Sequence, residues 1–213
     1  DERHLLLDAV QLGRDEQEFV EIVEKLNDQT GISALELNLS CPNLGRKTLV
    51  AQDPQATHQL VKRLKGISKF PLAAKLSPNV TDISEIAVAA ENAGVDAISL
   101  INTFTAMAID VKTRESRIGN FTGGLSGPAI RPIAVRMVHD VAKRVKIPVI
   151  GMGGIMTAND ALEFLIAGAT MVAVGTANFV NPRAPLEVLD GIQAYMKENK
   201  IKDIKEIIGS LQK

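Results

Sequence analysis

Polar side chains capable of chemistry stand directly after several short apolar segments of the chain. Asn38 lies at the end of segment 34–39, and Asn102 with Thr103 follows segment 97–101. An asparagine amide both donates and accepts hydrogen bonds, so two of them at strand ends suit an amide, imide or carboxylate of a heterocyclic ligand. One asparagine in a turn would indicate little, because turns favour this residue. The pair favours a binding site.

Cys41 is the only cysteine, and it lies in a polar loop between Ser40 and Pro42, with Asn43 one residue further on. A lone cysteine is usually a small buried hydrophobe. This polar context is equally compatible with an acid–base or nucleophilic role. Both interpretations of Cys41 stay open on these residues alone.

Lys75 lies inside the otherwise apolar segment 72–76. Burying an ammonium group without a partner costs a large amount of free energy. The side chain must therefore pair with an acid in the core or face an open site at the end of a strand. In the second case it would contact an electron-rich ligand.

Two glycine-bearing turns come late in the chain, at residues 151–154 and 175–176. Glycine lets backbone N–H groups approach phosphate oxygens, and the last strand–helix loops of a barrel commonly bind phosphate. Either turn alone could merely be a tight turn or a helix cap. Their position at consecutive strand ends favours a phosphate site.

Short strands and amphipathic helices that alternate along the chain would position these residues. Apolar residues at three- and four-residue steps predict the helices, and Thr157 with Asp160 resembles a capping box at the start of one of them. Alternation of this kind is typical of parallel βα units. The predicted strands are residues 5–10, 34–39, 72–76, 97–101, 149–151 and 171–174.

Two α/β architectures fit six such units. A doubly wound sheet is complete at this length, whereas a (β/α)₈ TIM barrel typically needs about 250 residues. Polar residues follow nearly every predicted strand at its C-terminal end, which is where a barrel gathers its chemistry. We therefore predict a (β/α)₈ TIM barrel, of which about six βα units are present.

Composition excludes several other classes of protein. The 213 residues carry a formal charge of −1 and only 3% aromatic residues, so nucleic acid is not an expected partner. The apolar runs are far shorter than the roughly 20 residues of a membrane helix, and the first residues are charged, so we expect neither a membrane helix nor a signal peptide. One cysteine favours the reducing cytoplasm, and the histidines lack metal-ligand spacing, so we expect no metal.

Residues 103–127 separate a strand from the next predicted helix, 129–145. Loops in βα units usually have about 2–6 residues, so a longer one usually has a function. Residues 108–111 and 117–120 could form a small hairpin over the site. The alternative is an unstructured insertion.

Five separated motifs follow one another along the chain: LNLSCPN at 37–43, KLSPNVTD at 75–82, GGLSGP at 123–128, GMGGI at 151–155 and VGTA at 174–177. Together they resemble the dihydroorotate dehydrogenases, and more narrowly the catalytic subunit of the NAD-linked class 1B enzymes. The likeness runs from about residue 34 to the C-terminus.

The resemblance implies an FMN-containing barrel that oxidises (S)-dihydroorotate to orotate in pyrimidine biosynthesis. Cys41 would be the catalytic base and take the C5 proton, while the C6 hydride passes to flavin N5. The resemblance also implies residues that bind the cofactor: Asn38, Lys75, Ile101, Gly127, Gly153, Gly154, Gly175 and Thr176. It implies four residues that bind the substrate: Asn38, Asn43, Asn102 and Thr103.

Family members begin with two further strands, so about 90 residues would precede Asp1 in a complete barrel. We expect residues 1–213 to be a single FMN-binding barrel domain without those two strands. The chain would then be a fragment, a processed chain or the ordered part of a longer one.

One cysteine cannot supply the four thiolates of an iron–sulfur cluster. The resemblance therefore implies a partner subunit with FAD and a [2Fe–2S] centre for transfer to NAD⁺, in a heterotetramer built on a homodimer of this chain. Fumarate is the alternative acceptor. Two other functions stay open: a catalytically silent flavin-binding fragment, and a flavin-free sugar-phosphate lyase or isomerase with Lys75 as a Schiff-base amine.

Overall fold

The computed structural model describes residues 8–11, 16–40 and 50–212 of the chain. Six strands form one sheet, and every neighbouring pair of strands is parallel. The strands are β1 (Asp8–Gln11), β2 (Ala34–Asn38), β3 (Leu72–Lys75), β4 (Ala97–Leu100), β9 (Val149–Met152) and β10 (Met171–Ala173). Each coincides with a predicted strand to within one to three residues at either end.

The strands lie side by side in the order in which they occur along the chain, β1-β2-β3-β4-β9-β10. A doubly wound sheet reverses its strand order at a switch point and places helices on both faces. No reversal occurs among the strands described. The sheet therefore has the winding of a βα barrel, as predicted, with six of the eight units.

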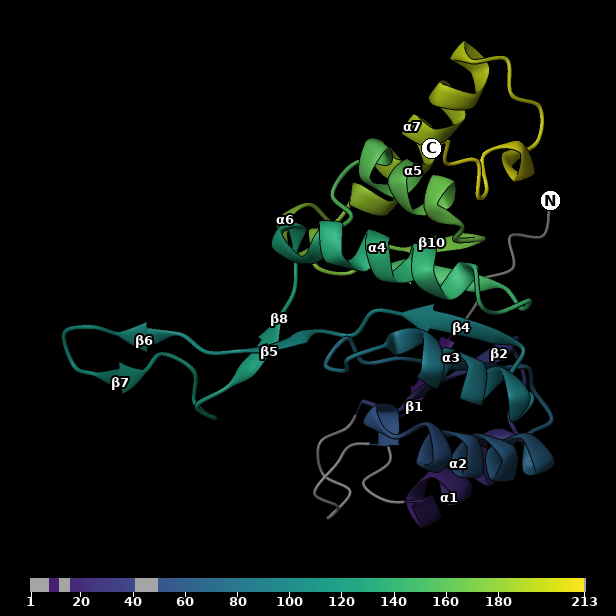
Figure 1. Ribbon diagram of the computed structural model, residues 1–213, viewed down its shortest axis with the longest axis vertical. Coiled ribbons are helices and arrows are strands. Elements are labelled where there is room, and N and C mark those ends of the chain that lie inside the picture. Colours follow the sequence, from purple (N-terminus) through teal and green to yellow (C-terminus); the bar gives the residue numbers. More distant parts are fainter. Residues whose placement is uncertain (1–7, 12–15, 41–49, 213) are drawn as a thin grey trace.

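The helices are also arranged in space in the order in which they occur along the chain. Each long helix packs against the next one along the chain, from α1 through α2, α3, α4 and α5 to α7, as Figure 1 shows. Their bounds are α1 Glu16–Leu26, α2 Pro54–Ile67, α3 Ile83–Asn92, α4 Arg131–Ala142, α5 Ala158–Ala167, α6 Ala177–Val180 and α7 Ala184–Glu198. Three short 3₁₀ turns cover Val50–Gln52, Pro128–Ile130 and Ile204–Glu206.

A continuous apolar core joins the strands to the inner faces of these helices. Leu37 and Ile98 from the sheet, and Leu64, Val138 and Phe164 from the helices, are fully buried. Their spacing on each helix is the three- and four-residue step read from the sequence, because that period places apolar side chains on one face. The helices thereby fix the sheet from which the site is built.

Side-chain N-caps fix the residues at which two of the helices begin. Thr157 accepts a hydrogen bond from the Asp160 N–H, and the Asp160 carboxylate accepts one from the Thr157 N–H. This is the capping box predicted from sequence. Asp53 caps α2 in a similar way, since its carboxylate accepts hydrogen bonds from the N–H groups of Gln55 and Ala56.

The long insertion after β4 forms an arm of two antiparallel pairs. At its base β5 (Phe104–Ala106) pairs with β8 (Gly123–Leu125), and further out β6 (Ile109–Asp110) pairs with β7 (Glu115–Ser116). The predicted hairpin is present, but residues 117–120 are not a strand, because the return strand pairs earlier. The outer pair projects away from the body (Figure 1), so it does not lie over the strand ends as expected.

Among the helices of the described segments, none combines the length and the apolarity that crossing a bilayer requires. Within the same segments, no three His, Cys, Asp or Glu side chains come together as a metal site would require.

Candidate active site

Three polar residues from adjacent strands form a row near the C-terminal end of the sheet. Asn38 of β2 is in register with Lys75 of β3, and Lys75 is in register with Ser99 of β4. Neighbouring residues in a parallel ladder project to the same side of the sheet. The row therefore places an amide, an ammonium and a hydroxyl along one face.

A cavity of about 310 Å³ opens beside this row, at the C-terminal ends of the strands. Nine residues predicted for the site line most of it: Lys75, Ile101, Asn102, Thr103, Gly127, Gly153, Gly154, Gly175 and Thr176. The other lining residues are Glu36, Ser126, Ile130, Met152, Ala173 and Val174. Six segments of the chain thus contribute to a single cavity.

Gly127 and Gly175 lie in the wall of this cavity and leave space in front of the backbone. A Cβ atom at Gly175 would meet no heavy atom within 4 Å, and one at Gly127 would meet only the Thr176 methyl group, at 3.6 Å. The Thr176 hydroxyl donates to Ser126 Oγ at 2.8 Å, which joins these two segments. Backbone can therefore approach a ligand closely here, as phosphate binding requires.

Lys75 pairs with an acid inside the cavity, at a distance of 3.3 Å from Nζ to Glu36 Oε1. Only 18% of the Lys75 side chain and 10% of the Glu36 side chain is exposed. The sequence offered pairing and site placement as alternatives, and the structure combines them. A positive and a negative charge consequently face the same ligand space.

A second cavity, of about 330 Å³, adjoins the first, since Asn102 and Thr103 line both. Its other lining residues are Ser40, Ser77, Asn79, Thr105, Thr122, Gly123 and Gly124. Ser40 Oγ is buried and has no hydrogen-bond partner among the described residues. This cavity therefore has the hydroxyl and amide lining that suits a small polar ligand.

Hydrogen bonds hold three amide side chains in place. Asn102 lines both cavities and Asn79 the second one, whereas Asn38 is in neither lining. Asn102 Nδ2 donates to Asn38 Oδ1 at 3.0 Å, and Asn102 Oδ1 accepts from the Thr103 N–H at 2.7 Å. Asn79 Nδ2 donates to the Thr103 carbonyl at 3.1 Å, and its Oδ1 accepts from the Thr105 N–H at 3.0 Å. These contacts fix the amides before any ligand arrives.

Two predicted site residues, Cys41 and Asn43, lie outside the described residues, so their roles stay predictions. Two functional candidates were missed by the sequence reasoning, namely Glu36 and Asn79. A signal for Glu36 existed, because residues two apart on a strand share a face and Asn38 was already assigned to the site. Asn79 lies within a quoted motif, but only its contacts with the arm give it a role.

Comparison with known proteins gives a consistent result. The dihydroorotate dehydrogenase family model matches residues 4–196. Two similar proteins are catalytic subunits of dihydroorotate dehydrogenase B (NAD(+)). The one from Lachnoclostridium phytofermentans is 53% identical over 201 residues, which cover 94% of this chain and 67% of the relative. The one from Caldicellulosiruptor bescii is 52% identical over 200 residues, covering 93% and 66%.

A crystal structure of DHODH from Eimeria tenella in complex with ferulenol has the same fold. Its TM-score is 0.74 at 23% identity, and the match covers 92% of this chain and 57% of that chain. The chain spans about two-thirds of the length of the curated relatives it matches.

Proposed function

Because the chain belongs to the dihydroorotate dehydrogenase family, we propose that it binds FMN and oxidises (S)-dihydroorotate to orotate, a step of pyrimidine biosynthesis. One observation carries the proposal: two adjoining cavities share Asn102 and Thr103. One cavity is walled by glycine segments and an ion pair, and the other is lined by amides and hydroxyls. A cofactor with a phosphate tail and a small polar substrate need such a pair of neighbouring spaces.

The residues of the first cavity fit a flavin mononucleotide. Gly127, Gly153, Gly154, Gly175 and Thr176 would hold the phosphate through their backbone, since the space beside Gly175 is open. Lys75 and Ile101, which also line this cavity, would lie against the ring system. When bound, FMN supplies an acceptor for the hydride that leaves C6 of the substrate.

The residues between the cavities fit dihydroorotate, a cyclic ureide that carries a carboxylate. Asn38 and Asn102 offer complementary donors and acceptors, and their mutual hydrogen bond orients both amides. Thr103 and Asn43 would complete the set of substrate contacts. The amides would orient the ring so that the hydrogen on C5 faces the base and the hydrogen on C6 faces the hydride acceptor.

Cys41 would act as the base. Its thiolate would take the C5 proton as a hydride leaves C6, and the electron pair of the C5–H bond would form the C5=C6 double bond of orotate. Proton transfer to a positioned side chain typically contributes about 10²–10⁴-fold to a rate. Ser40, the preceding residue, lines the second cavity, which supports placing the thiol there.

Electrons would leave this chain through a partner subunit. The relatives are named catalytic subunits, and one cysteine is too few for a cluster held by four thiolates. The partner would carry FAD and a [2Fe–2S] centre and pass electrons to NAD⁺, with two copies of this chain at the centre of the assembly. The cytoplasmic location expected from the single cysteine stays a prediction.

An anaerobic absorbance experiment tests the proposal. The full chain, purified with FMN, should lose its flavin absorbance when dihydroorotate is added. Cys41→Ala should bind FMN normally but bleach about 10²–10⁴-fold more slowly at neutral pH. Absence of bleaching in the unaltered protein would reject the dehydrogenase, and unchanged rates in Cys41→Ala would reject this base. Trapping of a sugar phosphate on Lys75 by borohydride would instead support the lyase.

A further inference from the structure

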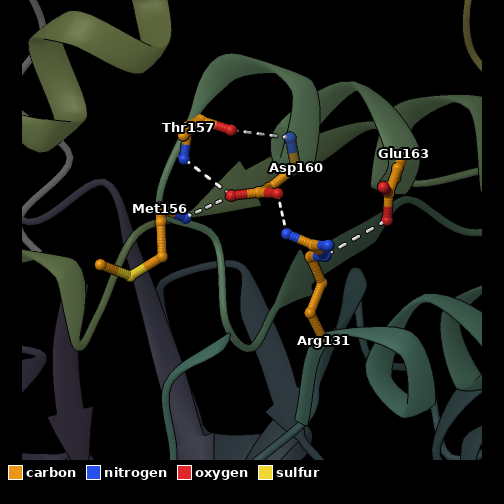
Figure 2. Close-up of polar contacts among 5 residues, drawn as sticks. All are labelled: Arg131, Met156, Thr157, Asp160 and Glu163. Carbon is orange, nitrogen blue, oxygen red and sulfur yellow. Dashed lines mark hydrogen bonds and ion pairs between the residues drawn. The ribbon is translucent and has the colours of Figure 1, made fainter. Parts of the chain in front are cut away.

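A buried carboxylate joins the start of α4 to the start of α5, as Figure 2 shows. Asp160 is 6% exposed and forms an ion pair with Arg131. Its other oxygen accepts hydrogen bonds from the N–H groups of Met156, at 2.9 Å, and Thr157, at 2.8 Å. Glu163 Oε2 lies 3.4 Å from Arg131 Nε on the outer side. Asp160 thus binds two separate segments at once.

The same two segments pack backbone against backbone. A Cβ atom at Gly154 would lie 2.7 Å from the Gly127 carbonyl oxygen and 2.9 Å from Arg131 Cβ. Both glycines have positive φ, +78° at Gly154 and +88° at Gly127, a region that other residues rarely adopt. No side chain fits at Gly154, so the two segments meet there through their backbone, and the side-chain contacts around this point help to set their separation.

The position of Arg131 is explained by its two acidic partners. Arg131 begins α4, and a cation at a helix N-terminus is unfavourable because of the helix dipole. It is absent from the lining of both cavities. Its Nη1 pairs with Asp160, and its buried Nε lies 3.4 Å from Glu163 Oε2 without forming a hydrogen bond. It therefore serves the junction of the two segments rather than contacting a ligand.

We infer that Arg131 and Asp160 are positioning residues that hold Gly127 and the Gly153–Gly154 turn at the separation required to bind the phosphate of the flavin. This inference rests on the proposed function. Neither residue touches the ligand. Their effect should be confined to the phosphate-bearing cofactor, because the ring would be held elsewhere, at Lys75 and Ile101.

Asp160→Asn removes the charge with little change in shape. Its single amide oxygen can serve Arg131 or the two N–H groups but not both, and its NH₂ group then faces another donor. Asp160→Asn would therefore lose either the contact with Arg131 or the hydrogen bonds from the N–H groups of Met156 and Thr157. We expect the dissociation constant of FMN to rise by at least about tenfold, and that of riboflavin, which lacks the phosphate, by less than about twofold.

Titration of the full apoprotein by quenching of flavin fluorescence measures both constants. Glu163→Gln is the matched control, since this half-exposed neighbour touches Arg131 but not the loop, and it should change neither constant more than about twofold. Arg131→Lys keeps the charge without the forked guanidinium and should weaken FMN by about threefold. Circular dichroism checks that each variant is folded.

Equal weakening of FMN and riboflavin in folded Asp160→Asn, or no weakening of either, would overturn the inference while leaving the proposed function intact. If Asp160→Asn does not fold, Arg131→Lys decides between the same outcomes. An unaltered protein that binds neither flavin would reject the proposed function and the inference with it.

Discussion

At the scale of single residues, the Lys75–Glu36 pair is the main electrostatic feature of the cavity. Both side chains are largely buried and 3.3 Å apart. Taking two charges out of water costs free energy that their attraction only partly offsets, so such a pair adds little net stability. Removing one partner is different, because the other charge is then left buried alone. The pair is therefore best explained by the charges that the site needs.

A double-mutant cycle tests this coupling. Glu36→Leu and Lys75→Met should each lower the free energy of unfolding by about 2–4 kcal/mol, because each leaves an unpaired charge of which some solvent contact remains. The double variant should lose at least about 1 kcal/mol less than the sum of the two losses. Urea denaturation measures all four corners of the cycle.

The exposed pair Arg136–Asp140 on α4 is the control, with side chains 60% and 40% exposed. Its cycle should give a coupling of no more than about 0.5 kcal/mol. Strict additivity at Lys75 and Glu36 would show that the two charges do not interact.

At the level of the secondary-structure elements, the three glycines between residues 151 and 154 serve two different purposes. Gly151 lies within β9, where a Cβ atom would come 2.7 Å from Phe164 Cδ1 of α5. Phe164 is fully buried and cannot move aside cheaply. Gly151 thus allows α5 to pack closely on the sheet, whereas Gly153 and Gly154 shape the turn that follows. From the sequence, all three glycines fall in one glycine-bearing turn, of which Gly153 and Gly154 were predicted to bind the cofactor.

Gly151→Ala should therefore destabilise the fold by about 1–3 kcal/mol through overpacking. Gly66→Ala is the matched control, because Gly66 lies in α2 and a Cβ atom there would meet nothing within 4 Å. Alanine at that helical position should raise stability by about 0.5–1 kcal/mol. Thermal or urea unfolding distinguishes the two, and stabilisation in Gly151→Ala would contradict the packing argument.

In the molecule as a whole, burial of apolar side chains stabilises the body much more than the arm. The body is a succession of βα units on one apolar core, whereas β6 and β7 contact chiefly each other. The arm carries exposed apolar side chains, including Val111 at 85% exposure and Phe121 at 72%. The arm therefore contributes little to the free energy of unfolding of the body.

Val111→Asp should consequently change the free energy of unfolding by less than about 0.5 kcal/mol, as is usual for exposed positions. Val138→Asp, at a fully buried position in α4, should cost more than about 4 kcal/mol because it buries an unpaired charge. Urea titrations of both variants make the comparison. A large loss in Val111→Asp would show that the outer part of the arm supports the core.

Residue spacing along the chain was enough to predict the six strands of the main sheet and the class of fold. All six strands, the capping box of Thr157 and Asp160 and the glycine segments of the cavity follow from local spacing, because helix and strand periods and caps depend on residues a few positions apart. Polar residues at successive strand ends were sufficient to predict that Lys75, Asn102 and Gly175 meet.

Residue spacing could not predict which charged side chains become neighbours. Lys75 with Glu36, and Arg131 with Asp160, join different βα units, and such contacts depend on strand register and on how adjacent helices pack. The direction of the arm and the junction of Gly127 with Gly154 depend on the same packing. Local patterns place a residue on a face, whereas a distance between two faces is set by everything packed between them.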